Sequence, residues 1–288
     1  DLDNISFVKS TTFPEPETPF SLVLVKIPKS LALLQHQLAQ LRPYCNENTV
    51  IIGAGMVKTI HRSTLNLFER HLGPTNTSLA KKKARLIYAK VDQDLVSPSS
   101  PFPKHYVLEN SDYRIHNHAN VFSRESLDIG TRFLLEHIPV SEAARTILDL
   151  GCGNGVVGLI AAEKNPHAEL IFCDESFMAC DSAEVNFRAA HGDRPARFYP
   201  ADCLGHITKN SIDLILNNPP FHQQNAVGDF IAWQMFTESL SALKVGGELL
   251  VIGNRHLQYQ AKLKRIFGNC RQVASNKKFV ILSARKEG

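Results

Sequence analysis

Long apolar runs, a leader sequence and paired cysteines are all absent from this chain. No apolar stretch among its 288 residues approaches the ~18 residues that span a bilayer, so we expect no membrane partner. The chain has no signal peptide and begins at Asp1 without a methionine, which leads us to expect a fragment of a cytoplasmic protein. The six cysteines form no CxxC pair and mostly lie in or beside apolar runs, which favours reduced, buried thiols over disulfides.

Acidic residues are scarce in two parts of the chain. Residues 20–91 hold 11 Lys and Arg but only two acids, Glu47 and Glu69, and residues 249–286 hold nine basic residues and no acid. Two basic blocks around a more acidic middle indicate a polyanionic partner. Basic residues on solvated helix faces would explain the same counts, so charge alone does not decide between the two interpretations.

The order of apolar segments predicts two α/β domains joined by a linker. In the first domain, residues 1–91, strands over 20–27, 49–53 and 83–89 alternate with helices over 28–44 and 63–72. Residues 92–104 are rich in Pro and Ser and poor in apolar residues, which is typical of a linker. The second domain then covers residues 105–288.

The first domain repeats the element order of the chain's C-terminal part. Val50–Ala54 resembles Leu250–Asn254, and Lys82–Lys90 resembles Lys277–Arg285, so we infer an internal duplication, with chance similarity as the alternative. The first copy would be degenerate and would lack its opening half, because nothing in the first domain corresponds to residues 105–211.

A glycine-rich turn follows the first strand of the second domain. Thr146–Leu150 reads as a strand and Val156–Ala162 as a helix, with Gly151, Cys152, Gly153, Asn154 and Gly155 between them. Glycines there allow a tight turn and close approach of a ligand, and the free N–H groups of the helix point toward it.

The next two strands end in acids. Asp174 ends the strand that begins at Glu169, about 20 residues past the glycines, where an acid accepts ribose hydroxyls. Asp202 follows the strand over 196–199 and is placed to meet an adenine amine. The dinucleotide pattern GxGxxG is absent, because position 156 is Val and the third glycine is at 155. No Lys-Ser or Lys-Thr pair follows to make a phosphate-binding P-loop.

A stiff corner ends the fourth strand, at Asn218-Pro-Pro-Phe221. The prolines have fixed φ angles and no N–H groups, so the Asn218 oxygen and the Pro219 carbonyl are acceptors for the two N–H bonds of a planar amine. Pro220 stiffens the corner, and Phe221 is placed to stack on the ring that carries the amine. The alternative is a simple turn that ends a strand. The first copy has Val25-Lys-Ile-Pro-Lys29 where the second has Asn217-Asn-Pro-Pro-Phe221, so the first copy should not hold an amine.

His116 and His118 superficially resemble metal ligands. No third ligand is near them in the sequence, and isolated histidine pairs are more often loop residues, so we predict no metal site.

The motif Asp149-Leu-Gly-Cys-Gly-Asn-Gly155 resembles the first motif of class I S-adenosylmethionine-dependent methyltransferases, over about residues 105–288. The resemblance implies a Rossmann-like fold in which this motif, from Asp149 to Gly155, surrounds the methionine end of S-adenosylmethionine. It also implies that Asn218 presents an amine to the sulfonium methyl group. The duplication then implies two tandem methyltransferase-like domains, the first degenerate and truncated at its N-terminus.

Several segments resemble the large-subunit type of the bacterial ribosomal RNA guanine-N2 methyltransferases, namely Tyr113–Ser123, Asn218–Gln224, Ile252–Leu257 and Ile266–Cys270. The resemblance implies methylation of the exocyclic N2 amine of a guanine in large-subunit ribosomal RNA, with no DNA partner. It also implies that the loop around Phe122 closes over the cofactor and that the N-terminal copy binds RNA.

Other functions stay open on the sequence. The nearest is methylation of small-subunit ribosomal RNA, followed by enzymes with Asn-Pro-Pro-Tyr corners that act on DNA adenine or on a glutamine amide of release factors. A non-catalytic RNA-binding or assembly protein is the alternative of another class. The target nucleotide and the oligomeric state do not follow from the sequence.

Overall fold

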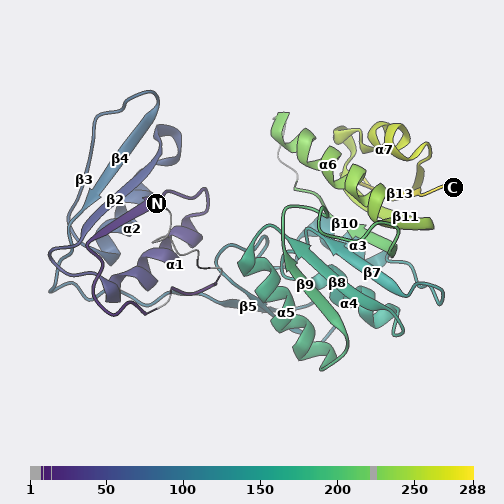
Figure 1. The fold of residues 1–288 in the computed structure, drawn as a ribbon, viewed down its shortest axis with the longest axis horizontal. Helices are drawn as coiled ribbons and strands as arrows, with labels where there is room; N and C mark the ends of the chain where they lie inside the picture. Colours follow the sequence, from purple (N-terminus) through teal and green to yellow (C-terminus); the bar gives the residue numbers. More distant parts are fainter. Residues whose placement is uncertain (1–7, 9, 14, 221–225) are drawn as a thin grey trace. The chain divides into compact units, whose positions relative to one another are not determined.

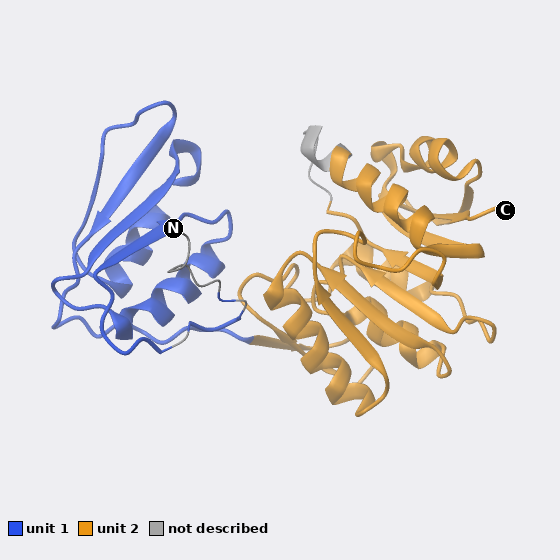
Figure 2. Cartoon of the chain, viewed as in Figure 1, with its two compact units in different colours: residues 1–103 blue, residues 104–288 orange. Residues whose placement is uncertain are grey.

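The chain forms two compact units, residues 1–103 and 104–288, in a computed structural model that describes residues 8, 10–13, 15–220 and 226–288 (Figures 1 and 2). The division falls at the end of the segment predicted as a linker. Among the described residues, no helix has both the length and the apolar character needed to cross a membrane.

The N-terminal unit is a four-stranded sheet with two helices on one face. Its elements are β1 (Leu22–Lys26), α1 (Leu31–Leu41), β2 (Val50–Met56), α2 (Arg62–His71), β3 (Thr75–Thr77) and β4 (Ala84–Ala89), with short 3₁₀ turns at Arg42–Tyr44 and Val57–Thr59. Apolar side chains of the helices and strands form one core, which includes Leu34, Leu38, Ile51, Phe68 and Ile87. The opposite face exposes Leu24 of β1 and Tyr88 of β4.

The second unit is built on a seven-stranded sheet in the order β12-β13-β11-β10-β7-β8-β9. Its strands are β7 (Thr146–Leu150), β8 (Glu169–Asp174), β9 (Ala196–Pro200), β10 (Ile212–Asn217), β11 (Leu243–Asn254), β12 (Arg271–Ser275) and β13 (Phe279–Arg285). β13 is antiparallel to both of its neighbours, β11 and β12, and all the other neighbouring pairs are parallel. The central strands are buried on both faces, which explains their nearly continuous apolar sequences.

Helices cover both faces of this sheet. They are α3 (Ile129–Glu136), α4 (Val156–Lys164), α5 (Phe177–His191), α6 (Ala226–Ala242) and α7 (Tyr259–Phe267). Leu134, Val157 and Phe187 place α3, α4 and α5 in one core, whereas Phe236 and Leu263 place α6 and α7 in the core on the other face. A separate hairpin, β5 (Lys104–Val107) and β6 (Arg114–Asn117), precedes α3, and a 3₁₀ turn (Arg255–Leu257) follows β11.

The chain reverses its direction of travel across the sheet after β9. The order β7, β8, β9 proceeds to one side, and β10 then pairs with the free side of β7. The carboxyl ends of β7 and β10 therefore lie next to each other, which is where open α/β sheets bind their ligands.

The N-terminal sheet repeats one half of the larger sheet. The order β1-β2-β4-β3 and its strand directions match β10-β11-β13-β12, with one parallel pair followed by two antiparallel pairs. The duplication inferred from the sequence is thus present in the topology.

The strand pairing corrects one of the two sequence matches behind that inference. The match between the segments that begin at Lys82 and Lys277 makes Ile87 equivalent to Leu282. These two residues pair with Gly53 and Val251 respectively. The match between the segments that begin at Val50 and Leu250 aligned Gly53 with Gly253 instead, and is wrong by two residues. A shift of two keeps every side chain on the same face of a strand, so the apolar pattern does not reveal the error.

The corrected register also compares the two corners. It makes Val25 equivalent to Asn217 and Lys26 equivalent to Asn218. The first copy therefore carries an ammonium group where the second copy carries a side-chain amide.

Several element boundaries differ from the sequence predictions, and the short strands β3 and β12 were missed. Helix α3 begins at Ile129, because the Asp128 carboxylate caps it by accepting the N–H of Thr131 at 2.8 Å. Helix α2 begins at Arg62, one residue before the predicted range, with His61 at its N-cap position. Strand β12 is a polar edge strand that pairs only with β13, so its sequence lacks the apolar alternation of a core strand.

Candidate active site

The turn between β7 and α4 is built on three glycines in the left-handed region. Gly151, Gly153 and Gly155 have φ angles of 72°, 55° and 78°. A Cβ atom on Gly155 would lie 2.7 Å from the Cβ of Ala183, whereas nothing lies within 4 Å of the corresponding point on Gly153. Glycine at 155 is therefore required by packing against α5, while the backbone at 153 faces open space.

Asp174 connects the end of β8 to this turn. Its carboxylate accepts hydrogen bonds from the backbone N–H groups of Gly153, at 3.0 Å, and of Ser176, at 2.9 Å. Burial raises the pKa of Asp174 in spite of these bonds. Asp202 is exposed and follows Ala201, whose N–H donates to the Asp174 carbonyl at 2.9 Å. The two predicted acids therefore lie on adjacent strand ends.

Two residues of the predicted cofactor set face the protein interior. The buried Asp149 carboxylate accepts the N–H of Gly158 in α4 at 2.8 Å, and burial raises the pKa of Asp149 to about 7. Cys152 is also buried, and burial raises the pKa of its thiol. These two side chains act by holding the turn in place.

The corner after β10 carries a buried acceptor without a partner. Asn218 Nδ2 donates to Thr131 Oγ1 of α3 at 3.0 Å, but Asn218 Oδ1 has no hydrogen-bond partner among the described residues. Buried polar atoms are nearly always satisfied in folded proteins, so an orphaned oxygen at a sheet's ligand-binding edge indicates a ligand. Pro219 is buried and Pro220 is exposed.

The predicted site holds two aromatic residues, Phe122 and Phe221. Phe221 lies outside the described residues. Phe122 is 64% exposed and precedes Ser123, which has a φ angle of 52°. An exposed phenyl group on a tight turn leaves apolar surface free for a ligand.

Sequence reasoning missed the residues that hold the corner. The Thr131 hydroxyl lies 3.4 Å from the Asp128 carboxylate, which accepts its proton, so the same hydroxyl oxygen is an acceptor for Asn218. Asn217 Nδ2 donates to the Leu150 carbonyl at 2.8 Å and joins β10 to the end of β7. Only the capping position of Asp128, one residue before α3, had a local signal in the sequence.

Sequence reasoning also missed an asparagine network behind the glycine turn. Asn154 Nδ2 donates to Asn117 Oδ1 at 2.9 Å and to the Tyr106 hydroxyl at 3.1 Å. Asn186 of α5 donates to the Asn154 carbonyl at 2.9 Å. The turn is thereby fixed to both the β5-β6 hairpin and α5.

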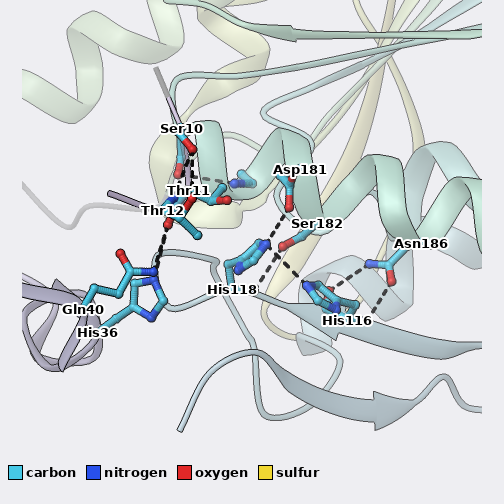
Figure 3. Close-up of polar contacts among 12 residues, drawn as sticks. Ser10, Thr11, Thr12, His36, Gln40, His116, His118, Asp181, Ser182 and Asn186 are labelled. Atoms are coloured by element: carbon cyan, nitrogen blue, oxygen red, sulfur yellow. Dashed lines mark hydrogen bonds and ion pairs between the residues drawn. The ribbon is translucent and has the colours of Figure 1, made fainter. Parts of the chain in front are cut away.

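The histidine pair has a third partner that the sequence did not reveal. His118 Nε2 lies 2.6 Å from Asp181 Oδ2 and 3.4 Å from His116 Nε2 (Figure 3). Asp181 was missed because it lies 63 residues further along the chain.

Comparison with known families divides the chain as the structure does. Residues 112–283 match the methyltransferase small domain, and residues 1–93 match the RLMG N-terminal domain.

Individual relatives match over nearly the whole chain. The ribosomal RNA large subunit methyltransferase G of Pseudomonas paraeruginosa is 52% identical over 99% of this chain and 76% of its own length. The protein of the same name from Yersinia enterocolitica is 52% identical over 94% of this chain and 68% of its own. A solved 16S rRNA N2 methyltransferase of T. thermophilus, in complex with AdoMet and guanosine, superposes with a TM-score of 0.77. That structure is 22% identical, the match covers 93% of this chain and 74% of that one, and at this identity it supports the fold alone.

Proposed function

The chain belongs to the family of ribosomal RNA large subunit methyltransferase G, and from this membership we propose that it methylates the exocyclic N2 amine of one guanine in large-subunit ribosomal RNA. S-adenosylmethionine is the cofactor of this family and its methyl donor. The observation that carries the proposal is the buried, unpartnered Oδ1 atom of Asn218 at the carboxyl end of β10.

The residues at the edge of the sheet suit S-adenosylmethionine. The open space beside the backbone of Gly153 leaves room for a ligand to approach the turn. Asp174 keeps one carboxylate oxygen on Gly153 and one on Ser176, which orients it at the end of β8 for ribose hydroxyls. Asp202 is exposed on the neighbouring strand end, where an adenine amine would meet it. Phe122 supplies apolar surface for closing the site.

In this proposal the chain's own contribution to catalysis is positioning. Asn218 Oδ1 and the Pro219 carbonyl accept the two N–H bonds of the guanine amine, which favours a pyramidal nitrogen and aims its lone pair. The bound cofactor supplies an electrophilic methyl group. No general base is needed beforehand, because the amine nitrogen loses a proton readily once it carries positive charge. Most of the rate then comes from orientation.

The target guanine must be outside a base pair to reach the corner. Flipping a base out of a helix costs a few kcal/mol, and contacts elsewhere on the RNA have to offset this cost. In the proposal the N-terminal unit supplies them. Lys81, Lys82 and Lys83 are exposed at the turn of its last hairpin. Among the described residues, no salt bridge uses a Lys or Arg of 20–91, so this charge is available to phosphates.

The test is to incubate the protein with labelled S-adenosylmethionine and unmodified large-subunit or small-subunit ribosomal RNA, and then to digest the RNA to nucleosides. The proposal expects labelled N2-methylguanosine from the large-subunit RNA alone. An Asn218→Ala variant serves as the matched control, and it should bind the cofactor without forming product.

Each other result has a distinct meaning. The same nucleoside from small-subunit RNA alone would keep the chemistry and refute the substrate. Label on adenine or on a protein glutamine would refute the guanine assignment. Failure to bind S-adenosylmethionine would favour a non-catalytic RNA-binding protein.

A further inference from the structure

The β5-β6 hairpin is attached to α5 through a cluster of polar side chains. His116 lies on β6 and His118 follows two residues later, so both side chains project from the same face. On α5, Asn186 accepts the N–H of His116 at 2.7 Å, and Ser182 accepts the N–H of His118 at 3.1 Å. The backbone of both histidines is thereby held against the helix, and Asp181 stands beside Ser182 (Figure 3).

Three potential ligand atoms converge in this cluster. The Nε2 atoms of His116 and His118 are 3.4 Å apart, and Asp181 Oδ2 is 2.6 Å from His118 Nε2. All three ligand atoms lie within 4.8 Å of one another. The two imidazole rings are nearly perpendicular, at 79°, so their Nε2 edges meet at one point.

The three groups do not satisfy one another fully. A single proton on His118 Nε2 has two neighbours, the Asp181 carboxylate and His116 Nε2. His118 Nδ1 is buried and has no hydrogen-bond partner among the described residues.

We propose that His116, His118 and Asp181 bind a divalent transition-metal ion of the Zn²⁺ type. With Zn–N bonds of ~2.0–2.1 Å, two tetrahedral ligands of one ion lie about 3.3–3.4 Å apart. The observed separation of the two Nε2 atoms is 3.4 Å. Asp181 stands closer to His118 than two ligands of one ion would, and its side chain, which is 47% exposed, would move outward to coordinate. Two imidazoles and one carboxylate leave a coordination position for water.

The proposed metal site is connected to the glycine turn through Asn186. Asn186 bonds both backbone groups of His116, and the same Nδ2 atom donates to the Asn154 carbonyl in the glycine turn. An ion at the cluster would hold the hairpin and α5 together at the point where both support that turn. Its effect on the enzyme would therefore be on the rigidity of the turn, without contact with the reacting amine.

Titration with Zn²⁺ alone tests the proposal. The full chain is prepared without a histidine tag, stripped of metal with a chelator, and titrated by isothermal calorimetry. We expect one ion per chain. The variants His116→Ala and Asp181→Asn should each weaken binding by more than about 100-fold, because each removes a direct ligand. His167→Ala removes an exposed histidine outside the cluster and should bind as the original chain does.

Asp181→Asn keeps the test meaningful if His116→Ala fails to fold, since the amide retains a hydrogen-bond acceptor for His118. Its circular dichroism and its affinity for S-adenosylmethionine report whether it is folded. Co²⁺ gives a second readout, because tetrahedral Co²⁺ absorbs visible light more strongly than octahedral Co²⁺. The absence of saturable one-to-one binding, or unchanged affinity in both site variants, would overturn the proposal. Neither result would affect the proposed methylation.

Discussion

Thr131 accepts a hydrogen bond from the side-chain amide of Asn218 across 3.0 Å, and this bond decides which end of the amide is free. The Thr131 hydroxyl gives its own proton to Asp128, so it has only an acceptor to offer. The Asn218 nitrogen is thereby held by α3, and its oxygen is left as the acceptor that the proposed mechanism needs.

Removing the Asn218 amide should slow turnover strongly. With Asn218→Ala we expect methyl transfer to slow by ~10²–10³-fold, which is the usual cost of losing one preorganised polar contact with the reacting group. The affinity for S-adenosylmethionine, measured by calorimetry, should stay roughly unchanged. An equal loss of binding and turnover would contradict the assignment of Asn218 to the amine.

Removing the Thr131 hydroxyl should act on the rate through Asn218. With Thr131→Val we expect kcat to fall about tenfold, since a hydrogen bond of ~1.4 kcal/mol no longer orients the amide. KM for the cofactor should change little. Thr131→Ser keeps the hydroxyl and should retain most of the rate, whereas an equal loss in both variants would mean that the hydroxyl alone does not account for the effect.

Two glycines of the same turn should fail in different ways. Gly155→Ala places a Cβ 2.7 Å from Ala183 at a φ angle of 78°, and we expect it to lower the free energy of unfolding by about 2–4 kcal/mol. The Cβ of Gly153→Ala meets no atom, so we expect its left-handed φ angle alone to lower the free energy of unfolding by about 1–2 kcal/mol. Gly153→Ala should instead weaken cofactor binding. Urea denaturation and calorimetry measure the two quantities, and similar effects of both changes on stability would contradict this division.

The stability of the second unit should depend on pH through Asp149. Its pKa is raised to about 7 in the folded state from 3.8, so folding favours the protonated carboxyl group. The stabilisation is complete below about pH 4 and is lost as the pH rises through 7, by roughly 1.4 kcal/mol for each pKa unit at most. Asp149→Asn keeps an acceptor for Gly158 and removes this dependence. Urea denaturation at pH 5 and pH 8 should show the original chain losing stability relative to the variant, and parallel pH profiles would refute the effect.

The elements of the site that follow one another along the chain were predictable from the sequence. The strand, glycine turn and helix over 146–162 have strong local signals in apolar runs and breakers, and the structure confirms them. Asp174 was predicted at the end of the next strand, and its carboxylate accepts the N–H of Gly153 in the turn. The α/β fold with two methyltransferase-like units was predicted by the same reasoning together with the resemblance, and it is confirmed.

The supporting contacts were not predictable, because they join residues far apart in the chain. Thr131 and Asn218 are separated by 87 residues, and Asn154 and Asn117 by 37. Neither pair has a local pattern that distinguishes it from ordinary polar residues. Asp181 shows the same limit: its distance in sequence from His118 led to the prediction of an isolated histidine pair. Contacts of this kind depend on how α3, α5 and the β5-β6 hairpin pack.

The position of β13 has a consequence for the order in which the protein is made. β13 is the last strand of its unit in the sequence, yet it lies between β11 and β12 in the sheet, and β4 lies in the same way between β2 and β3. Each unit therefore leaves two strand edges unpaired until its final strand has been synthesised. A nascent chain that stops before Phe279 should expose the edges of β11 and β12 to pairing with other chains, as unprotected strand edges do. Folding on the ribosome would thus be completed late and in one step for each unit, after the residues of the proposed site have been synthesised.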